Sequence, residues 1–342
     1  MDKLKVAVVG IGHLGQAHAR VCSELPDVEL VAVADPVPDR AGPLAEKFRC
    51  RYEPDYRALP DLGVQAVSIV TPTVTHYEVA EFFISRGIPA LVEKPMTACS
   101  AEGRKLVELA RARSGLLQVG HIERFNPAVM ALDQYRFRPR YIEAVRVAPI
   151  SFRSLDVGVV MDLMIHDIDI VAHFARSSVA SLQAVGVNVV GAHEDIANAR
   201  LTFKNGCVAT LTASRVATKA ERRVRIFAEN AYYTLDYMRR KANIYEKAPD
   251  LMKMAATFDW RRLGAAEIAE LREHFIGKLV TEKDVTYEDH EPLKKEWEYF
   301  VRSVLTGEPP LVTGEEALAA IEVAEWIVRD IGDFIQRARD NP

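Results

Sequence analysis

The feature that most constrains the fold is a glycine loop near the amino terminus, Gly10-Ile11-Gly12-His13-Leu14-Gly15. An apolar run that begins at Leu4 leads directly into the loop, and an amphipathic helical pattern follows it. In this context one glycine permits a tight turn, one lets the backbone approach a pyrophosphate, and one lets helix and strand pack closely. The amide-rich start of the helix would receive the pyrophosphate. The loop therefore predicts dinucleotide binding by Gly10, Gly12, His13, Leu14 and Gly15.

The residues around this loop alternate between short apolar runs and amphipathic stretches. Such alternation indicates βαβ units, and continuous apolar strands are typical of a parallel sheet with helices on both faces. We therefore predict an α/β, doubly wound Rossmann domain over 1–121. Its strands are expected over 4–10, 28–35, 65–71, 89–94 and 116–120, and its helices over 14–24, 38–48, 74–86 and 100–114.

Beyond Gly120 the pattern changes to closely spaced extended runs separated by turn signals such as Lys204-Asn205-Gly206. This spacing favours an antiparallel sheet. We predict a C-terminal α+β domain over 122–342, built on a large open, mostly antiparallel sheet with helices on one face. Its strands are expected over 141–150, 181–190, 196–205, 207–215, 223–230 and 231–238, its helices near 127, over 162–175 and in two terminal stretches, and 247–285 is left unassigned.

Composition excludes several classes of protein. The chain has 342 residues and a formal net charge of -4, which argues against a nucleic-acid-binding surface. No apolar run approaches the roughly 18 residues that a membrane helix needs, and the first residues lack the pattern of a secretory signal. Its four cysteines are scattered without a C-x-x-C pair. We expect a cytoplasmic protein with no membrane partner, no nucleic-acid partner and no metal.

Asp35 stands 20 residues after Gly15, at the end of the second predicted strand. A carboxylate at that position accepts hydrogen bonds from the adenosine ribose hydroxyls and repels a 2′-phosphate. Arg40, five residues further on, could instead reach such a phosphate, and an Asp before Pro36 could simply cap the following turn. The pattern favours NAD over NADP.

Two further strand ends carry polar residues. In open α/β sheets, ligands bind outside the carboxyl ends of the strands. Thr71, Pro72 and His76 follow one strand and could contact the nicotinamide side of the cofactor, or His76 could be a helix-start residue without a ligand. Glu93 and Lys94 end the next strand. A partly desolvated ammonium there could donate to a substrate hydroxyl, although Lys94 could also pair only with Glu93 or solvent.

The stretch 162–169 reads Asp-Leu-Met-Ile-His-Asp-Ile-Asp. Asp162, His166 and Asp169 are spaced by four and three residues, so on a helix they share one face. An imidazole with a pKa near 6.5 suits removal of a hydroxyl proton at neutral pH, as hydride transfer from a carbinol requires. A metal site and a buried structural pairing are the alternatives. No further His or Cys cluster supplies the remaining ligands of a metal.

Together, the glycine loop, Asp35, T-P-x-x-x-H, E-K-P and D-x-x-x-H, in this order, resemble the Gfo/Idh/MocA oxidoreductase family across essentially the whole chain. The resemblance implies a Rossmann domain and a substrate domain whose open sheet serves homodimer or homotetramer contacts. It also implies that Lys94, Asp162 and His166 line the substrate, with His166 as acid/base. One departure is Met164, which stands where the family commonly has glycine in D-x-G-x-H.

The stretch 120–127, Gly-His-Ile-Glu-Arg-Phe-Asn-Pro, together with 162–169, resembles the branch that oxidises the 3-hydroxyl of UDP-N-acetylglucosamine. That branch implies substrate contacts from His121, Arg124 and Asn126. Arg124 could instead form a salt bridge with Glu123 or with a carboxylate at a helix start.

The leading hypothesis is thus an NAD-dependent dehydrogenase of a sugar or sugar nucleotide. Two alternatives retain the cofactor site. One is a glycosidase that uses NAD transiently, and the other is a catalytically silent dinucleotide-binding regulator. A regulator has no need to keep both Lys94 and His166, so their joint presence favours an enzyme.

Overall fold

The computed structural model describes residues 3–150, 157–247, 264–266, 268–269 and 280–340. The chain divides into two compact units, each assembled from separate stretches of sequence. Unit 1 comprises Met1–Phe125, Val160–Asp169 and His290–Gly332, and unit 2 comprises Asn126–Val159, Ile170–Asp289 and Asp333–Pro342.

Unit 1 is built on a six-stranded sheet in which every neighbouring pair is parallel. The strand order is β3-β2-β1-β4-β5-β6, so successive crossovers run to one side of β1 and then, from β4, to the other. The boundary between β1 and β4 is the switch point where such sheets bind ligands. Val6 and Val8 of β1 are fully buried, as expected for a central strand covered on both faces. The strands are β1 (Leu4–Val9), β2 (Val28–Ala34), β3 (Arg51–Glu53), β4 (Ala66–Ile69), β5 (Ala90–Glu93) and β6 (Leu117–Gly120).

Helices cover both faces of this sheet, because right-handed crossovers leave β1 in opposite directions on its two sides. On one face α1 (His13–Glu24), α2 (Pro38–Phe48) and α9 (Pro292–Thr306) share one core cluster with β1 and β2. Trp297 of α9 is the largest fully buried side chain there. The other helices are α3 (His76–Ile84), which packs against α4 (Ser100–Arg113), α10 (Gly314–Asp340), which starts in unit 1, and the 3-10 turns η1 (Tyr56–Leu62), η2 (Thr73–Thr75) and η3 (Ile122–Phe125).

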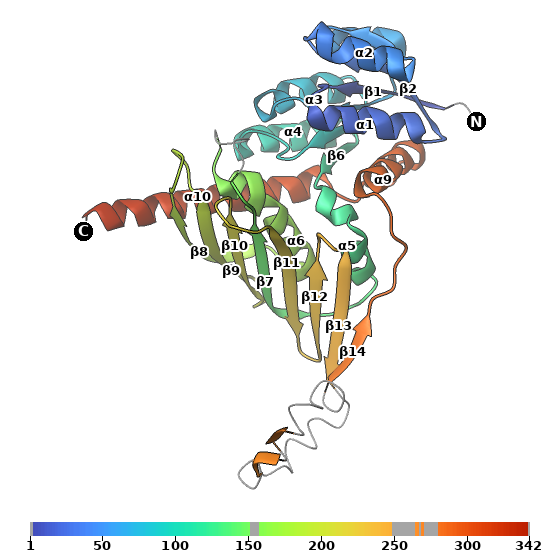
Figure 1. Ribbon diagram of the computed structural model, residues 1–342. Coiled ribbons are helices and arrows are strands. Elements are labelled where there is room, and N and C mark those ends of the chain that lie inside the picture. Colours follow the sequence, from blue (N-terminus) through green and yellow to red (C-terminus); the bar gives the residue numbers. More distant parts are fainter. Residues whose placement is uncertain (1–2, 151–156, 248–263, 267, 270–279, 341–342) are drawn as a thin grey trace. The chain divides into compact units, whose positions relative to one another are not determined.

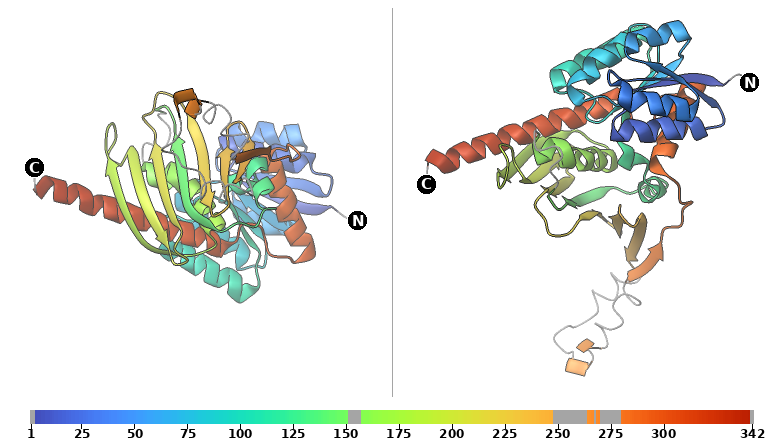
Figure 2. Two further views of the ribbon diagram at one scale, coloured as in Figure 1. Left: turned by 90° about the horizontal axis from the view of Figure 1, so that it is seen from below. Right: turned by 45° about the horizontal axis from the view of Figure 1, so that its top comes forward.

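Unit 2 is built on an eight-stranded sheet of order β14-β13-β12-β11-β7-β10-β9-β8, whose strands are labelled in Figure 1. Figure 2 shows the same sheet from two further directions. All neighbours are antiparallel except β7 and β10, which run parallel. Its strands alternate buried and exposed residues, so one face forms a core, to which α5 (Pro127–Leu132) contributes. The strands are β7 (Pro139–Val147), β8 (Val179–Val187), β9 (Ile196–Phe203), β10 (Val208–Ser214), β11 (Glu221–Ala228), β12 (Ala231–Asp236), β13 (Lys241–Lys247) and β14 (Val280–Asp284).

A helix that begins with a π turn, η4 (Val160–Met164), and continues as α6 (Ile165–Ala175) belongs partly to each unit. The predicted domains, 1–121 and 122–342, did not anticipate this exchange of segments or the return of α9 to the first unit. A division into separately folding domains stays a prediction.

The predicted fold class is confirmed, with a parallel doubly wound sheet and a large, mostly antiparallel one. Three strands were missed: β3, β13 and β14, the last within the stretch left unassigned. Much of that stretch lies outside the described residues. Among the described residues, no helix is long and apolar enough to cross a membrane.

Candidate active site

The three glycines of the loop differ in what surrounds them. Gly10 has a φ of +89°, and a Cβ there would lie 2.6 Å from the carbonyl oxygen of Val70. A Cβ on Gly15 would lie 1.9 Å from the Gly10 carbonyl oxygen, so α1 packs tightly on the loop. A Cβ on Gly12 would meet no described atom within 4 Å. Gly10 and Gly15 are therefore required by packing, whereas the space at Gly12 is open for a ligand.

Asp35 ends β2 and is buried, with only 4% of its surface exposed. Its carboxylate accepts hydrogen bonds from the backbone of Ile11 in the glycine loop at 2.8 Å and of Val37 at 2.9 Å. Arg40 lies 3.5 Å from the same carboxylate. The turn cap weighed from the sequence is thus present, and the carboxylate also ties β2 to the loop. A contact of Arg40 with a 2′-phosphate stays untested, because Arg40 lies beside Asp35 itself.

A pocket of about 640 Å³ in unit 1 opens beside this carboxylate. Gly10, Asp35 and Arg40 line it on one side, and Thr71 and Pro72 line it on another. Its position at the carboxyl ends of β1, β2 and β4 is where a doubly wound sheet receives a dinucleotide. The lining fits an adenosine ribose, because it offers a carboxylate for hydroxyl groups, and Gly10 begins the loop that leads to the start of α1, where a pyrophosphate would bind.

His76 holds two strand-end loops together. One ring nitrogen, Nδ1, lies 2.9 Å from the carbonyl oxygen of Pro95, and the other, Nε2, lies 2.8 Å from that of Thr71. The side chain is almost completely buried, and burial lowers the pKa of His76, although the two carbonyl oxygens partly oppose this. These contacts support a structural role; contact with the cofactor stays a prediction.

Lys94 follows β5 and directs its ammonium at the helix that carries Asp162. Nζ donates a hydrogen bond to the backbone carbonyl oxygen of Asp162 at 2.8 Å and lies 4.0 Å from its carboxylate. Its side chain keeps 20% of its surface exposed. The predicted pair of Lys94 and Asp162 is therefore in contact within unit 1, although the two residues are 68 positions apart along the chain.

The helix is irregular at this contact. Asp162 lies in the π turn η4, and His166 follows in the first turn of α6. An ammonium that donates to a helical carbonyl group competes with the backbone of the next turn, which is one recognised cause of helix irregularity. Single π turns occur frequently at functional sites. Met164, at the position where the family commonly has glycine, is fully buried.

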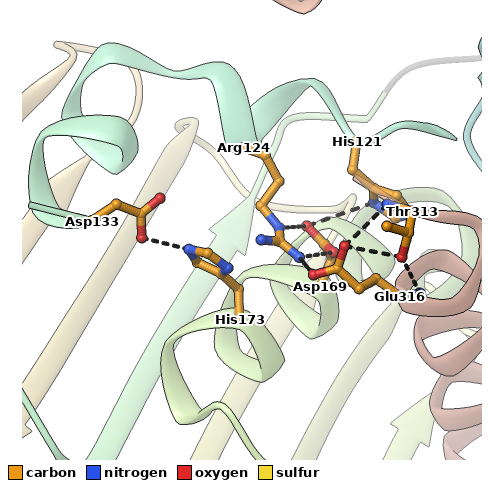
Figure 3. Close-up of polar contacts among 7 residues, drawn as sticks. All are labelled: His121, Arg124, Asp133, Asp169, His173, Thr313 and Glu316. Carbon is orange, nitrogen blue, oxygen red and sulfur yellow. Dashed lines mark hydrogen bonds and ion pairs between the residues drawn. The ribbon is translucent and has the colours of Figure 1, made fainter. Parts of the chain in front are cut away.

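Arg124 lies in a buried ion-pair cluster (Figure 3). It donates to both carboxylate oxygens of Asp169, at 2.8 and 3.1 Å, and to Glu316 at 3.0 Å. Glu316 also accepts from the backbone of Thr313, forming a capping box at the start of α10. Burial alone would lower the pKa of Arg124, but these carboxylates raise it. Arg124 thus forms the salt bridge with a helix-start carboxylate, Glu316, that was one of the alternatives from the sequence. A contact of Arg124 with the substrate stays a prediction.

His121 lies in the same buried region, with Nδ1 at 3.9 Å from Asp169. Burial lowers the pKa of His121, and the positive charges of Arg124 and Lys94 lower it further, against the opposing effect of Asp169. Within the part of the chain that the structure describes, neither ring nitrogen forms a hydrogen bond. Asn126 instead caps α5, accepting from the backbone of Ala128 at 3.2 Å. Substrate binding by His121 and Asn126 stays a prediction.

Sequence reasoning missed two groups of residues. Tyr56 and Arg57 line the pocket beside Asp35, just after the missed strand β3. Recognition of that strand would have pointed to them, because its carboxyl end lies at the same sheet edge. His18 and Glu296 lie behind Glu93 in the core, and nothing in the local sequence marks them as a pair.

Comparison with known proteins identifies the family. Residues 4–121 match "Oxidoreductase family, NAD-binding Rossmann fold", and residues 135–234 match "GFO/IDH/MocA C-terminal domain". UDP-N-acetylglucosamine 3-dehydrogenase of Acidithiobacillus ferrooxidans is 39% identical over 293 residues, which are 83% of this chain and 91% of that protein. The chain belongs to the Gfo/Idh/MocA family. The predicted resemblance is confirmed.

A solved structure of this relative and a second relative support the assignment. A solved structure of the Acidithiobacillus ferrooxidans UDP-N-acetylglucosamine 3-dehydrogenase superposes with a TM-score of 0.85 at 34% identity, covering 98% of this chain and all of that one. The scyllo-inositol 2-dehydrogenase (NAD(+)) of Bacillus subtilis strain 168 is 30% identical over 202 residues, or 54% of this chain and 57% of that protein.

Membership in the Gfo/Idh/MocA family confirms the predicted class of activity. The chain is an NAD-binding oxidoreductase, and its relatives are named as dehydrogenases of hydroxylated small molecules. The prediction of NAD as cofactor is likewise confirmed by the family description.

Proposed function

We propose that the protein is an NAD-dependent dehydrogenase that oxidises the 3-hydroxyl of UDP-N-acetylglucosamine or a closely similar sugar nucleotide. The observation that carries this proposal is the contact between Lys94 Nζ and the Asp162 carbonyl, one helical turn before His166. It gathers a cation, a carboxylate and an imidazole in the unit that contains the glycine loop. The substrate class is supported by the relative that is 39% identical over 83% of this chain.

His166, Lys94 and Asp162 would have different roles in the oxidation of the substrate hydroxyl. Bound NAD supplies the hydride acceptor. His166 removes the proton of the substrate hydroxyl as the carbon loses its hydride, so a ketone, NADH and a proton are formed. Lys94, fixed by Asp162, donates a hydrogen bond to the same oxygen and stabilises its developing negative charge. Asp162 orients Lys94 and the substrate hydroxyls.

A substrate panel tests the proposal. The protein is incubated with NAD and, separately, UDP-N-acetylglucosamine, UDP-N-acetylgalactosamine, free N-acetylglucosamine and myo-inositol, and NADH formation is followed by absorbance. We expect UDP-N-acetylglucosamine to give the highest kcat/KM and the free sugar to lose at least tenfold, since remote binding energy supports the chemical step. Faster oxidation of myo-inositol would contradict the proposed substrate. Release of a free sugar without net NADH would instead indicate the glycosidase alternative.

We further propose that the open sheet of unit 2 pairs two copies of the chain. Four aromatic residues lie directly opposite one another across four adjacent strands: Tyr141, Phe227, Tyr232 and Tyr245. Their ring centroids are 5.7, 4.7 and 5.3 Å apart in succession. Neighbouring Ile226 and Ile244 point to the buried face, so the aromatic row lies on the opposite one. Phe227 is exposed and the three tyrosines are half-buried, so the row is continuous and partly open to solvent, which favours a protein partner.

A further inference from the structure

A buried polar cluster lies directly behind the strand end that carries Lys94. It consists of His18 from α1, Glu93 from β5 and Glu296 from α9, all in unit 1. His18 and Glu296 are fully buried and Glu93 is 7% exposed, and one polar atom of each lies within 4.8 Å of the others. Glu93 accepts a hydrogen bond from the backbone N–H of Lys94 at 3.2 Å. The cluster is therefore connected to the proposed catalytic lysine through one carboxylate.

The hydrogen bonds of His18 determine its tautomer. The indole Nε1 of Trp297 lies 3.2 Å from Nδ1 of His18, and an indole N–H can only donate. Nδ1 must therefore be the unprotonated nitrogen, which accepts. The Ser68 hydroxyl oxygen lies 2.9 Å from the same nitrogen and can also donate to it. The proton of the neutral ring is then on Nε2, which donates to Glu93 at 3.1 Å.

The same tautomer argues against a metal ion in this cluster. One histidine and two carboxylates are a donor set that could bind a divalent metal. A ligating Nε2 must be unprotonated, and its ring then carries the proton on Nδ1, usually donated to an acceptor. In this protein Nδ1 faces the donor of Trp297. His18 is thus arranged to donate to Glu93 and not to bind a metal ion.

The carboxyl group of Glu296 lies near the carboxylate of Glu93, with oxygens within 4.8 Å of each other. In the described part of the chain, neither of its carboxyl oxygens has a hydrogen-bond partner, and the side chain is fully buried. Burial raises the pKa of Glu296 well above its ordinary value, and the charge of Glu93 raises it further. The other titratable groups near Glu93 are His18 of α1, His76 of α3, Lys94 and His121. Two ionised carboxylates with oxygens within 4.8 Å of each other would repel each other at low dielectric.

We propose that Glu296 keeps its proton at neutral pH and donates a hydrogen bond to Glu93, so that it positions the Glu93–Lys94–Pro95 turn. Glu93 then carries the single negative charge of the cluster, held by Nε2–H of His18 on one side and the Glu296 hydroxyl on the other. Glu296 is a positioning residue that acts through Glu93 on Lys94. This proposal deepens the proposed function, on which the role of Lys94 rests.

Substitution of Glu296 tests the positioning role. Glutamine has the shape of the protonated acid and can donate the same hydrogen bond, so E296Q is expected to keep kcat within about threefold of the unchanged protein. E296A removes the donor and should lower kcat at least tenfold with little change in KM, because Lys94 loses its fixed position. E298Q, a half-exposed neighbour on α9 that pairs with Lys295, is the matched control and should change neither. Equal losses in E296Q and E296A would overturn the positioning role.

Thermal unfolding tests, without any substrate, whether the Glu296 carboxyl group is protonated. A carboxyl group in the unfolded chain has a pKa of about 4.3, whereas folded Glu296 holds its proton to higher pH. Its stabilising contribution is therefore complete below that value and is lost as pH rises through the folded pKa. The Tm of E296Q should rise relative to the unchanged protein as pH increases, and that of E298Q should not. A difference that does not vary with pH would overturn the proposal.

These readouts separate the two proposals. If no sugar is oxidised but the pH-dependent Tm difference is found, the proposal of a protonated Glu296 is supported and the proposed dehydrogenase function is contradicted. Addition of Zn²⁺ to the unchanged protein provides the remaining check. A rise in Tm with Zn²⁺ that E296Q abolishes would overturn the protonated acid in favour of a metal site.

Discussion

His166 and Lys94 have separate parts in the proposed reaction, and substitution can distinguish them. His166→Asn keeps a polar side chain of similar size but cannot take up a proton near neutral pH. We expect kcat with UDP-N-acetylglucosamine to fall by about 10² to 10⁴, the range typical of general acid–base groups, with the Kd for NAD unchanged. Stopped-flow NADH formation and NAD titration measure the two quantities. His193→Asn, on an exposed loop of unit 2, is the control, and an active His166→Asn enzyme would refute the assignment.

Asp35 determines which dinucleotide the pocket prefers. Asp35→Ser removes the charge that repels a 2′-phosphate and releases Arg40, now 3.5 Å away, to contact one. We expect NAD to bind about tenfold more weakly and NADP to gain, because hydrogen bonds to a charged group contribute about 1.5 to 3 kcal/mol. Titration with both dinucleotides checks this. Asp39→Ser, an exposed residue in the first turn of α2, should leave the preference as it was.

At the scale of elements, two glycines of the loop serve different purposes: Gly15 allows close packing, and Gly12 leaves space for a ligand. Gly15→Ala places a methyl group 1.9 Å from the Gly10 carbonyl oxygen and should destabilise the fold by about 3 kcal/mol or more. Gly12→Ala meets no described atom within 4 Å, so its Tm should stay close to that of the unchanged protein while NAD affinity drops. Thermal unfolding and NAD titration of both variants distinguish these outcomes. Loss of stability in Gly12→Ala would show that this glycine serves packing as well.

A strand can be predicted from the sequence when its own residues form a recognisable pattern. Buried parallel strands are continuous apolar runs, so β1, β2, β4 and β5 are legible from sequence. The strand β13 reads Lys-Ala-Asn-Ile-Tyr-Glu-Lys, and its polar residues conceal it, because its stability comes from pairing with β12 and β14. The strand β3 has only three residues.

The candidate site follows the same rule. Lys94, Asp162 and His166 can be chosen because strand ends and helical spacing mark them. The buried contacts of Arg124 with Asp169 and Glu316 join residues 45 and 192 positions apart, and no local pattern records them. The same holds for Trp297 and His18, which are 279 positions apart.

At the scale of the whole molecule, we expect the active protein to be an oligomer formed through the open sheet. Phe227→Lys places a charge in the middle of the aromatic row and should weaken self-association about 100-fold, the loss typical of a central interface residue. Sedimentation velocity over a range of concentrations measures this. Leu305→Lys changes an equally apolar, exposed side chain at the end of α9 and should have no effect. Unchanged association of Phe227→Lys would exclude this face as the interface.

The π turn at Val160–Met164 has a consequence for how the sequence tolerates length changes. A π turn holds one residue more than an α-helical turn, so deletion of a residue there can be absorbed by reverting to a regular helix. Each residue of an α-helix advances by about 100°, so deletion of Leu163 or Met164, which shortens the spacing from Asp162 to His166 from four residues to three, would turn one side chain relative to the other by roughly that angle. A one-residue deletion in this turn should therefore give a folded protein that binds NAD and does not turn over substrate, whereas the same deletion within β1 would shift the whole strand against its neighbours.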